Sequence, residues 1–316
     1  MKMTVSAAAL AIIAITFVLG SAFGRSGLQG QAANKDLEPA IKKGDDLFKA
    51  GKYAEALQQY KEVLNRDPGN DHVMEYTILS YNRMGDREQA RSWMKRRLEI
   101  PDQTPSIKAR VLTDLALLYW DEARSNLLRS TGGGEKVKVE DAAAIMKLVA
   151  DGTDSAQKAV AIAPRSAKAF NLLNLLERVQ AEIEQDGSKQ KDLIAKADEA
   201  LRHSIGFYEA STQQQQAHDM FAAPTVSVPA GQSAEGLKLG QAKKLGFGNL
   251  RSANGSTVAV EVLVGIDGKV LYPRVVSAPP KIGDAAIAAA RQWEFEPSTF
   301  EGHSVQVIEM ISFPVK

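Results

Sequence analysis

The 316-residue sequence contains no cysteine, which excludes disulfide bonds, thiolate zinc sites, iron–sulfur clusters and cysteine nucleophiles. It also has almost no net charge, because 39 basic side chains are balanced by 38 acidic ones. This balance argues against a protein that binds DNA or RNA. Aromatic residues are scarce at 6 %, whereas Ala, Leu, Gln and Lys are plentiful. The composition favours helices that pack through small side chains.

Histidine is scarce too, with only His72, His203, His218 and His303 in the chain. No two of them stand three or four residues apart, the spacing at which a helix presents a pair of metal ligands. The Gly-x-Ser-x-Gly pattern of a nucleophilic serine is absent. We therefore expect a non-enzymatic protein with no catalytic residues, no metal and no cofactor.

The N-terminus carries one long apolar run, residues 5–23, which follows Lys2 and precedes Arg25. As a helix this run would be about 28 Å long, close to the ~30 Å hydrocarbon core of a bilayer. Residues 1–33 are therefore predicted to be either a cleaved signal peptide or a retained transmembrane helix in the inner membrane. Either alternative places the rest of the chain in the periplasm, within the cell envelope.

Between residues 34 and 210 the sequence is typical of helical hairpins, and the first two superimpose with a shift of 34 residues. Gly51 matches Gly85, and Ala56 matches Ala90. Such a period is the signature of a helical solenoid. Residues 52–70 resemble the second helix of a tetratricopeptide repeat, which implies an all-α solenoid that binds proteins in its concave groove.

Downstream the repeat is looser, but four further helices are predicted. They cover residues 109–123, 142–163, 169–185 and 190–208, so the chain holds about four hairpins. By the register of the repeat, six side chains should line the groove and contact a protein partner: Ile41, Asp45, Phe48, Glu75, Leu79 and Arg83. Ile41 and Asp45 stand where chaperone-binding relatives carry the Lys and Asn that hold a C-terminal carboxylate.

The pattern changes after the helices. Residues 211–236 are rich in Gln, Ala, Ser, Pro and Gly and are predicted to be a linker. Residues 258–264 then alternate with period two, and Asp267-Gly268 separates them from a second run over 270–276, which predicts a β-hairpin. A helix from Asp284 to Arg291 and a last strand over 305–315 complete a small α+β unit of β-β-α-β order.

Several segments of this unit resemble the C-terminal domain of the TonB family over residues 237–316. The segments that carry the resemblance are residues 268–270, 275–277, 284–290, 293–297, 302–305 and 313–315. Trp293 and Phe295 follow the helix in extended chain, and we expect both rings to lie in the core beneath the sheet. The whole protein is thus predicted to be multidomain, with a tetratricopeptide-type solenoid before a TonB-like domain.

The resemblance implies a periplasmic domain that contacts outer-membrane transporters and serves transmembrane transport. In that family the last strand pairs edge-on with a short transporter peptide, a mode in which backbone hydrogen bonds supply affinity. Here the edge would run over residues 306–313, with Val307, Glu309 and Ile311 as the partner contacts.

A second interpretation stays open, in which the TonB-like domain is only an interaction module of a periplasmic scaffold and transduces no energy. The N-terminal segment contains Ser6, but no His precedes His72. The family's energy transducers use a Ser and His pair in that segment to engage their motor.

Overall fold

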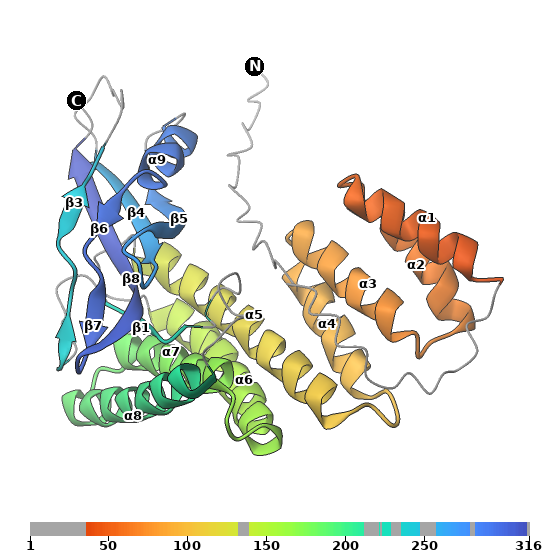
Figure 1. Ribbon diagram of the computed structural model, residues 1–316, viewed down its shortest axis with the longest axis horizontal. Helices are drawn as coiled ribbons and strands as arrows, with labels where there is room; N and C mark the ends of the chain where they lie inside the picture. The colour runs from red at the N-terminus through yellow and green to blue at the C-terminus, as the bar shows by residue number, and fades with distance from the viewer. Residues whose placement is uncertain are drawn as a thin grey trace. The chain divides into compact units, whose positions relative to one another are not determined.

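The computed structural model describes residues 36–131, 139–211, 221, 223–228, 235–246, 257–278 and 282–314 (Figure 1). The chain divides after Asp102 into two units. We call the described residues 36–102 the tetratricopeptide unit and the described residues 103–314 the second unit. The predicted N-terminal segment 5–23 lies outside the described residues. Within the described part, no helix has the length and apolarity needed to cross a membrane.

The tetratricopeptide unit consists of two helical hairpins. They are formed by α1 (Glu38–Lys49), α2 (Tyr53–Arg66), α3 (Asp71–Arg83) and α4 (Arg87–Leu98). The starts of α2 and α4 are 34 residues apart, as are the ends of α1 and α3. Gly51 and Gly85 end the first helix of each hairpin with φ of 75° and 78°, angles that favour glycine. The predicted 34-residue repeat is confirmed.

Small and large side chains fit together inside this unit. Ala56 and Ala90 are fully buried at equivalent positions of the two hairpins, and Tyr60 is buried between helices. Gly44 on α1 lies directly against the Tyr60 ring, because a Cβ added at Gly44 would come 2.4 Å from Cε1. The absence of a side chain at Gly44 therefore allows α1 and α2 to approach.

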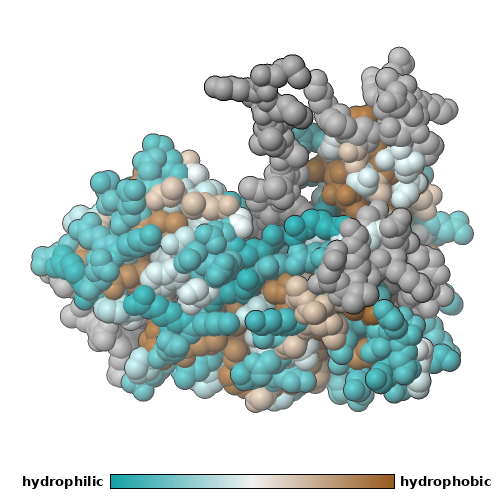
Figure 2. Space-filling model, turned by 180° about the vertical axis from the view of Figure 1, so that it is seen from behind, coloured by the Kyte–Doolittle hydropathy of each residue, from teal (hydrophilic) through white to brown (hydrophobic). Residues whose placement is uncertain are grey.

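Of the four helices predicted for the second unit, three are longer than predicted, and α7 keeps its predicted length of 17 residues but begins two residues earlier. They are α5 (Pro105–Thr131), α6 (Val139–Ile162), α7 (Ala167–Ile183) and α8 (Gly187–Ser211), and they pair as α5 with α6 and α7 with α8. Ser166 caps α7 by accepting a hydrogen bond from the N–H of Ala169, 3.2 Å away. In the space-filling view, hydrophilic side chains cover most of the visible helical surface, with smaller hydrophobic areas between them (Figure 2).

A β-sheet with one helix follows in the second unit. Its main elements are β4 (Thr257–Val264), β5 (Val270–Ser277), α9 (Gly283–Ala290) and β8 (His303–Pro314), which confirms the predicted β-β-α-β order. In the main sheet the described strands lie in the order β2–β7–β8–β4–β5, and β1 pairs with β8, whereas β3 and β6 pair with each other in a separate two-stranded sheet. The shorter strands are β1 (Thr225–Ser227), β2 (Leu237–Lys238), β3 (Ala242–Lys244), β6 (Glu294–Phe295) and β7 (Ser298–Phe300).

The hairpin between β4 and β5 has a longer turn than its Asp-Gly signal suggests. The N–H of Gly265 donates to the carbonyl of Lys269, so the loop spans five residues. Of the two central residues only Gly268 has a positive φ, 82°. A side chain at Gly268 would also collide with the Phe295 carbonyl, so packing as well as turn geometry requires glycine there.

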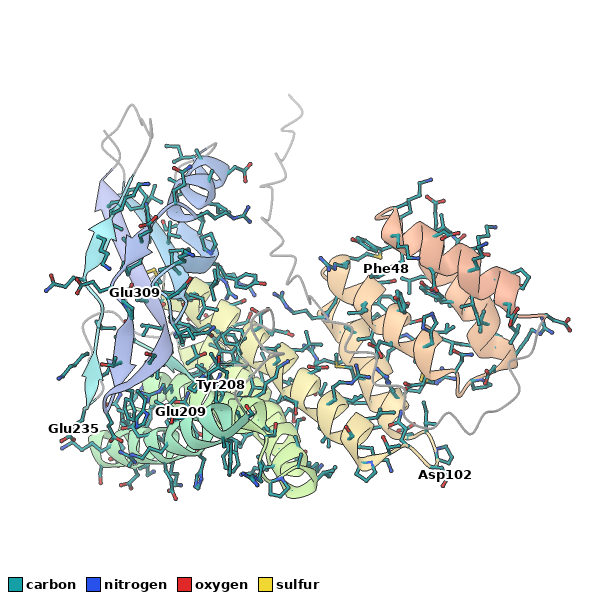
Figure 3. All side chains as sticks on the ribbon, viewed as in Figure 1. Phe48, Asp102, Tyr208, Glu209, Glu235 and Glu309 are labelled. Atoms are coloured by element: carbon teal, nitrogen blue, oxygen red, sulfur yellow. The ribbon has the colours of Figure 1, made fainter. Side chains whose placement is uncertain are left out.

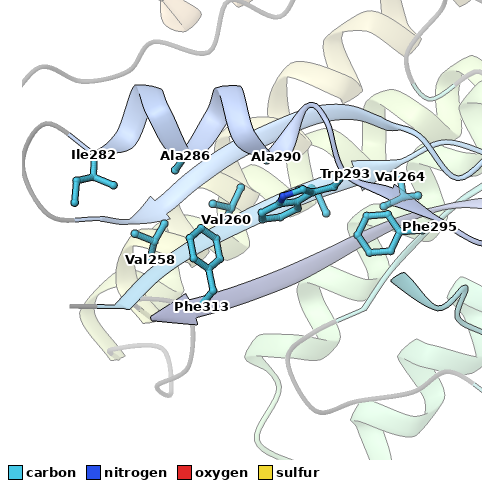
Figure 4. Close-up of a cluster of buried hydrophobic side chains, with 10 residues drawn as sticks. Val258, Val260, Val264, Ile282, Ala286, Ala290, Trp293, Phe295 and Phe313 are labelled. Atoms are coloured by element: carbon cyan, nitrogen blue, oxygen red, sulfur yellow. The ribbon is translucent and has the colours of Figure 1, made fainter. Parts of the chain in front are cut away.

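The core between α9 and the sheet contains the predicted aromatic pair (Figure 4). Trp293 and Phe295 are both buried, and the Trp293 ring meets Phe313 edge-on with centroids 5.6 Å apart. The indole Nε1 donates to the carbonyl of Gly246 at 2.8 Å. Both rings are thus core side chains, as the sequence predicts.

The contact between Gly44 and Tyr60 yields a stability prediction. We expect Gly44→Ala to lower the free energy of unfolding by about 1–2 kcal/mol, because overpacking outweighs the gain in helix propensity. The matched control is Gly206→Ala on α8, where an added Cβ meets no heavy atom within 4 Å. That substitution should stabilise by about 0.5–1 kcal/mol. Urea unfolding followed by circular dichroism measures both, and a neutral or stabilising Gly44→Ala would contradict the tight contact.

Candidate functional site

Strand β8 is the centre of the sheet and has different neighbours along its two edges. On one side β4 pairs with it antiparallel from Val307 to Pro314 without a register shift. On the other side β7 pairs with residues 303–305. Next to β7 on that side, β1 pairs parallel with residues 306–308. Beyond Ile308, none of the described strands pairs with this second side, and we call residues 309–313 the open edge.

The backbone of the open edge can be oriented from the β1 contacts. Gln306 donates its N–H to the carbonyl of Pro224, and Ile308 accepts from the N–H of Val228, both at 2.8 Å. Because successive residues of a strand turn their backbone groups to opposite sides, Met310 and Ser312 turn theirs to the same side as Gln306 and Ile308. The open edge therefore presents the N–H and C=O groups of Met310 and Ser312.

The three predicted edge contacts have different surroundings. Val307 is only 1 % exposed and packs with Leu201 and Ile205 of α8, so its side chain belongs to the core. Glu309 and Ile311 are half-buried, and Glu309 lies on β8 (Figure 3). Burial raises the pKa of the Glu309 carboxyl. The backbone groups of all three residues turn toward β4, so a partner strand on the other side of β8 would not bond to them. Partner contact through their side chains remains a prediction.

Two asparagines of α7 hold β1 in place. Asn171 Nδ2 donates to the carbonyls of Phe221 and Ala223 at 3.2 and 3.3 Å, and its Oδ1 accepts from the N–H of Thr225 at 2.8 Å. Asn174 Nδ2 donates to the carbonyl of Thr225 at 2.7 Å. These amides replace the hydrogen bonds that a neighbouring strand would make. β1 lies inside the predicted linker 211–236, so part of that segment is ordered and buried.

A buried charge cluster joins α5 and α7 to the face of the sheet that lies opposite α9. Arg124 of α5, only 4 % exposed, donates to Glu261 of β4 and to Glu182 of α7, each at 2.8 Å. Burial by itself would lower the pKa of Arg124, but the two carboxylates outweigh burial and raise it. Burial raises the pKa of Glu182, and Arg124 opposes this in part. The guanidinium therefore stays charged between two acidic partners.

A second arginine extends the cluster along the sheet. Arg274 of β5 lies opposite Glu261 in the strand register, with Nη1 of Arg274 3.9 Å from Oε1 of Glu261. Arg274 also bonds to Asp121 of α5 at 2.5 Å and to Ser125 Oγ at 3.0 Å. Five charged side chains from four elements thus occupy one contact between helices and sheet.

Sequence reasoning missed this cluster and both asparagines. Arg124 and Asp121 lie on α5 among apolar residues, and Asn171 and Asn174 stand among the leucines of α7. The sequence signal for such buried contacts is a pair of polar residues three positions apart on a helix face that is otherwise apolar.

Six groove residues were predicted in the tetratricopeptide unit, and the structure places three of them on α1 with specific contacts. Asp45 accepts from the Tyr60 hydroxyl at 2.9 Å, and its other carboxylate oxygen lies 3.0 Å from His72 Nε2. Phe48, labelled in Figure 3, lies on α1. Its ring meets the ring of Tyr76 edge-on, with centroids 5.0 Å apart. Ile41 packs half-buried against the same core.

The other three predicted groove residues lie on α3 and are half-buried. Glu75 bonds at 2.9 Å to Arg97, a buried guanidinium that also pairs with Asp71 at 2.6 Å. Leu79 and Arg83 follow one and two turns later on the same helix. The contacts join α1 to α3 through Asp45 and His72, but a partner in this groove remains a prediction.

Comparison with known families finds a match, which covers the last part of the chain. A family model described as Gram-negative bacterial TonB protein C-terminal matches residues 250–315. The matched residues include β4, β5, α9 and β6–β8, so this sheet is a TonB-type C-terminal domain. The family is a non-enzymatic interaction domain of the Gram-negative cell envelope.

No curated protein sequence matches the chain. Two crystal structures of MamA align at 14 % and 15 % identity, over 58 % and 53 % of this chain and 98 % and 95 % of theirs, with TM-scores of 0.27 and 0.23. At these TM-scores the alignments carry no argument about the arrangement. The repeat assignment rests on the chain's own helices and their 34-residue spacing.

The charge cluster yields the second prediction. Arg124→Met should lower the free energy of unfolding by about 3–5 kcal/mol, because Glu261 and Glu182 would stay buried without their cation. The control is Arg202→Met, which removes the ion pair between Arg202 and Glu301. The side chains of these two residues are 52 % and 43 % exposed. That loss should stay below about 1 kcal/mol. Urea unfolding measures both variants. Equal decreases in the free energy of unfolding would show that the buried cluster stabilises the fold no more than an exposed ion pair does.

Glu177 on α7 yields a prediction about pH. Its Oε2 is buried without a hydrogen-bond partner among the described residues, and burial raises the pKa of Glu177 from 4.5 to about 7. The folded chain therefore keeps a proton that the unfolded chain releases, so stability should fall as pH rises from 4.5 to about 7.

The variant Glu177→Gln should remove this part of the pH dependence. We expect it to be more stable than the wild type above neutral pH and equally stable near pH ~4, where both states bind the proton. Urea midpoints across this range measure the effect, with Asp192→Asn at an exposed position of α8 as the control. Parallel pH profiles for Glu177→Gln and the wild type would contradict the raised pKa.

Proposed function

We propose that this protein is a non-enzymatic component of the bacterial cell envelope that binds one protein through its TonB-type domain and another through its tetratricopeptide repeats. The first partner is an outer-membrane transport component or its periplasmic peptide, and the role is in transmembrane transport. The match of residues 250–315 to a Gram-negative envelope family and the apolar run over residues 5–23 support this location.

The observation that carries the proposal is the open edge of β8. Met310 and Ser312 present their backbone N–H and C=O groups on a side where no described strand pairs beyond Ile308. Such an edge accepts an extended peptide as an additional strand. The edge is also rigid, because β4 pairs along the whole of residues 307–314.

The proposed domain organisation follows the sequence. Residues 1–33 serve as a signal peptide or an inner-membrane anchor, 34–210 as helical repeats, 211–236 as the connection and 237–316 as the TonB-type domain. Within this organisation, β1 makes part of the connection a strand of the second unit.

A second candidate function is a periplasmic scaffold that uses the same edge but transduces no energy. The charge cluster favours it, since Arg124, Glu261 and Arg274 fix the sheet on helices α5 and α7. Dissipating the proton gradient distinguishes the two: deletion of the protein should mimic uncoupling of transport only if energy passes through it.

The docking edge is tested with the full chain and overlapping synthetic peptides from the periplasmic segments of outer-membrane transporters. Ser312→Pro removes one outward N–H but leaves the β4 ladder intact, so peptide affinity should fall roughly tenfold. Ser312→Ala keeps that N–H and serves as the matched control. Fluorescence anisotropy measures binding, and circular dichroism confirms that each variant is folded.

Equal affinities for the Ser312→Pro and Ser312→Ala variants would place the peptide elsewhere. If neither Ser312 variant changes binding but Asp45→Ala abolishes it, the peptide binds in the tetratricopeptide groove.

A further inference from the structure

Strand β1 occupies part of the very edge that a partner strand would use. We propose that β1 is a permanent neighbour of β8 and restricts docking to a short strand of about five residues beside the open edge, in line with β1. That the incoming strand comes from a transporter rests on the proposed function. β1 thereby sets the length and position of the peptide that the TonB-type domain takes.

The occupied part of the edge is closed completely. β1 pairs with Gln306, Val307 and Ile308, all of which are buried. Thr225, Val226 and Ser227 of β1 are buried as well. A peptide can reach the backbone of residues 306–308 only if β1 leaves.

Departure of β1 would break contacts with two other elements. Asn171 and Asn174 of α7 hold its backbone, and Thr225 Oγ1 bonds to Gln306 Oε1 at 3.0 Å. Val226 packs with Leu201 of α8 in a buried cluster. Because leaving these buried amides without partners would cost free energy, a weakly binding peptide cannot displace β1.

Among the described residues, the last backbone bond from this segment to β8 is that of Val228, whose N–H donates to Ile308. The next residue in the sequence is Pro229, which has no N–H to donate. The open edge that remains is five residues long, about 17 Å at ~3.3 Å per residue. An incoming strand pairs with Met310 and Ser312 and meets β1 end to end.

The opposite edge of the sheet is less suited to docking. β5 lies there and carries Pro273 at its centre, with register shifts on both sides of the central pairs to β4. Proline and irregular pairing are the usual protection of an edge strand. Among the described strands, the favourable site for an added strand is therefore the open edge of β8.

The first part of the test needs no partner and follows amide exchange of the full chain by NMR. The N–H of Gln306 should exchange at least a hundredfold more slowly than that of Ser312. In Asn171→Ala the exchange of Gln306 should become at least tenfold faster, whereas Asn126→Ala on α5 should leave it unchanged. Similar exchange rates for Gln306 and Ser312 in the wild type would overturn the proposal.

The second part measures the affinity of transporter-derived peptides of three to nine residues. In the wild type, affinity should rise up to about five residues and then stay constant, with Gln306 still protected. Affinity that keeps rising to nine residues, together with loss of Gln306 protection, would show that β1 is displaced and would overturn the proposal. Failure of every peptide to bind, with Gln306 protected, supports the closure by β1 but contradicts the proposed docking function.

Discussion

The second unit depends on the charge of Arg124, which is buried where helices and sheet meet. A guanidinium cannot give up its proton in a protein, so its burial requires fixed carboxylates. Glu182 comes from α7 and Glu261 from β4, and each must approach within hydrogen-bond distance. This requirement fixes both the distance and the rotation of the sheet on the helices, which apolar packing alone would leave less defined.

The same contact fixes the TonB-type domain of this chain on the helices of the second unit. Its sheet has one face covered by α9 and the Trp293 core, while Glu261 and Arg274 on the other face bind α5. Along the edge of β8 that β4 leaves free, β1 covers residues 306–308. A domain mounted in this way holds the open edge of β8 at a constant orientation to α5 and α7.

The sequence predicts the local elements well and their assembly poorly. Glycine spacing at Gly51 and Gly85 gives the repeat, and alternation around Asp267-Gly268 gives the hairpin, because both signals come from neighbouring residues. The contacts of Arg124 with Glu261 and of Asn171 with Thr225 join residues 137 and 54 positions apart. No local pattern records such pairs, and Val307 shows the consequence, since strand alternation could not reveal that β1 and α8 bury it.

The parallel pair of β1 and β8 also has a consequence for the order of folding. Thr225 and Gln306 are 81 residues apart, and β8 is the last of the described strands in the sequence. Contacts across such separations form late, because a long loop must close first. Until β8 is in place, β4 lacks its central neighbour and β1 has no strand to pair with. The strand that carries the open edge is therefore also the one whose arrival completes the sheet.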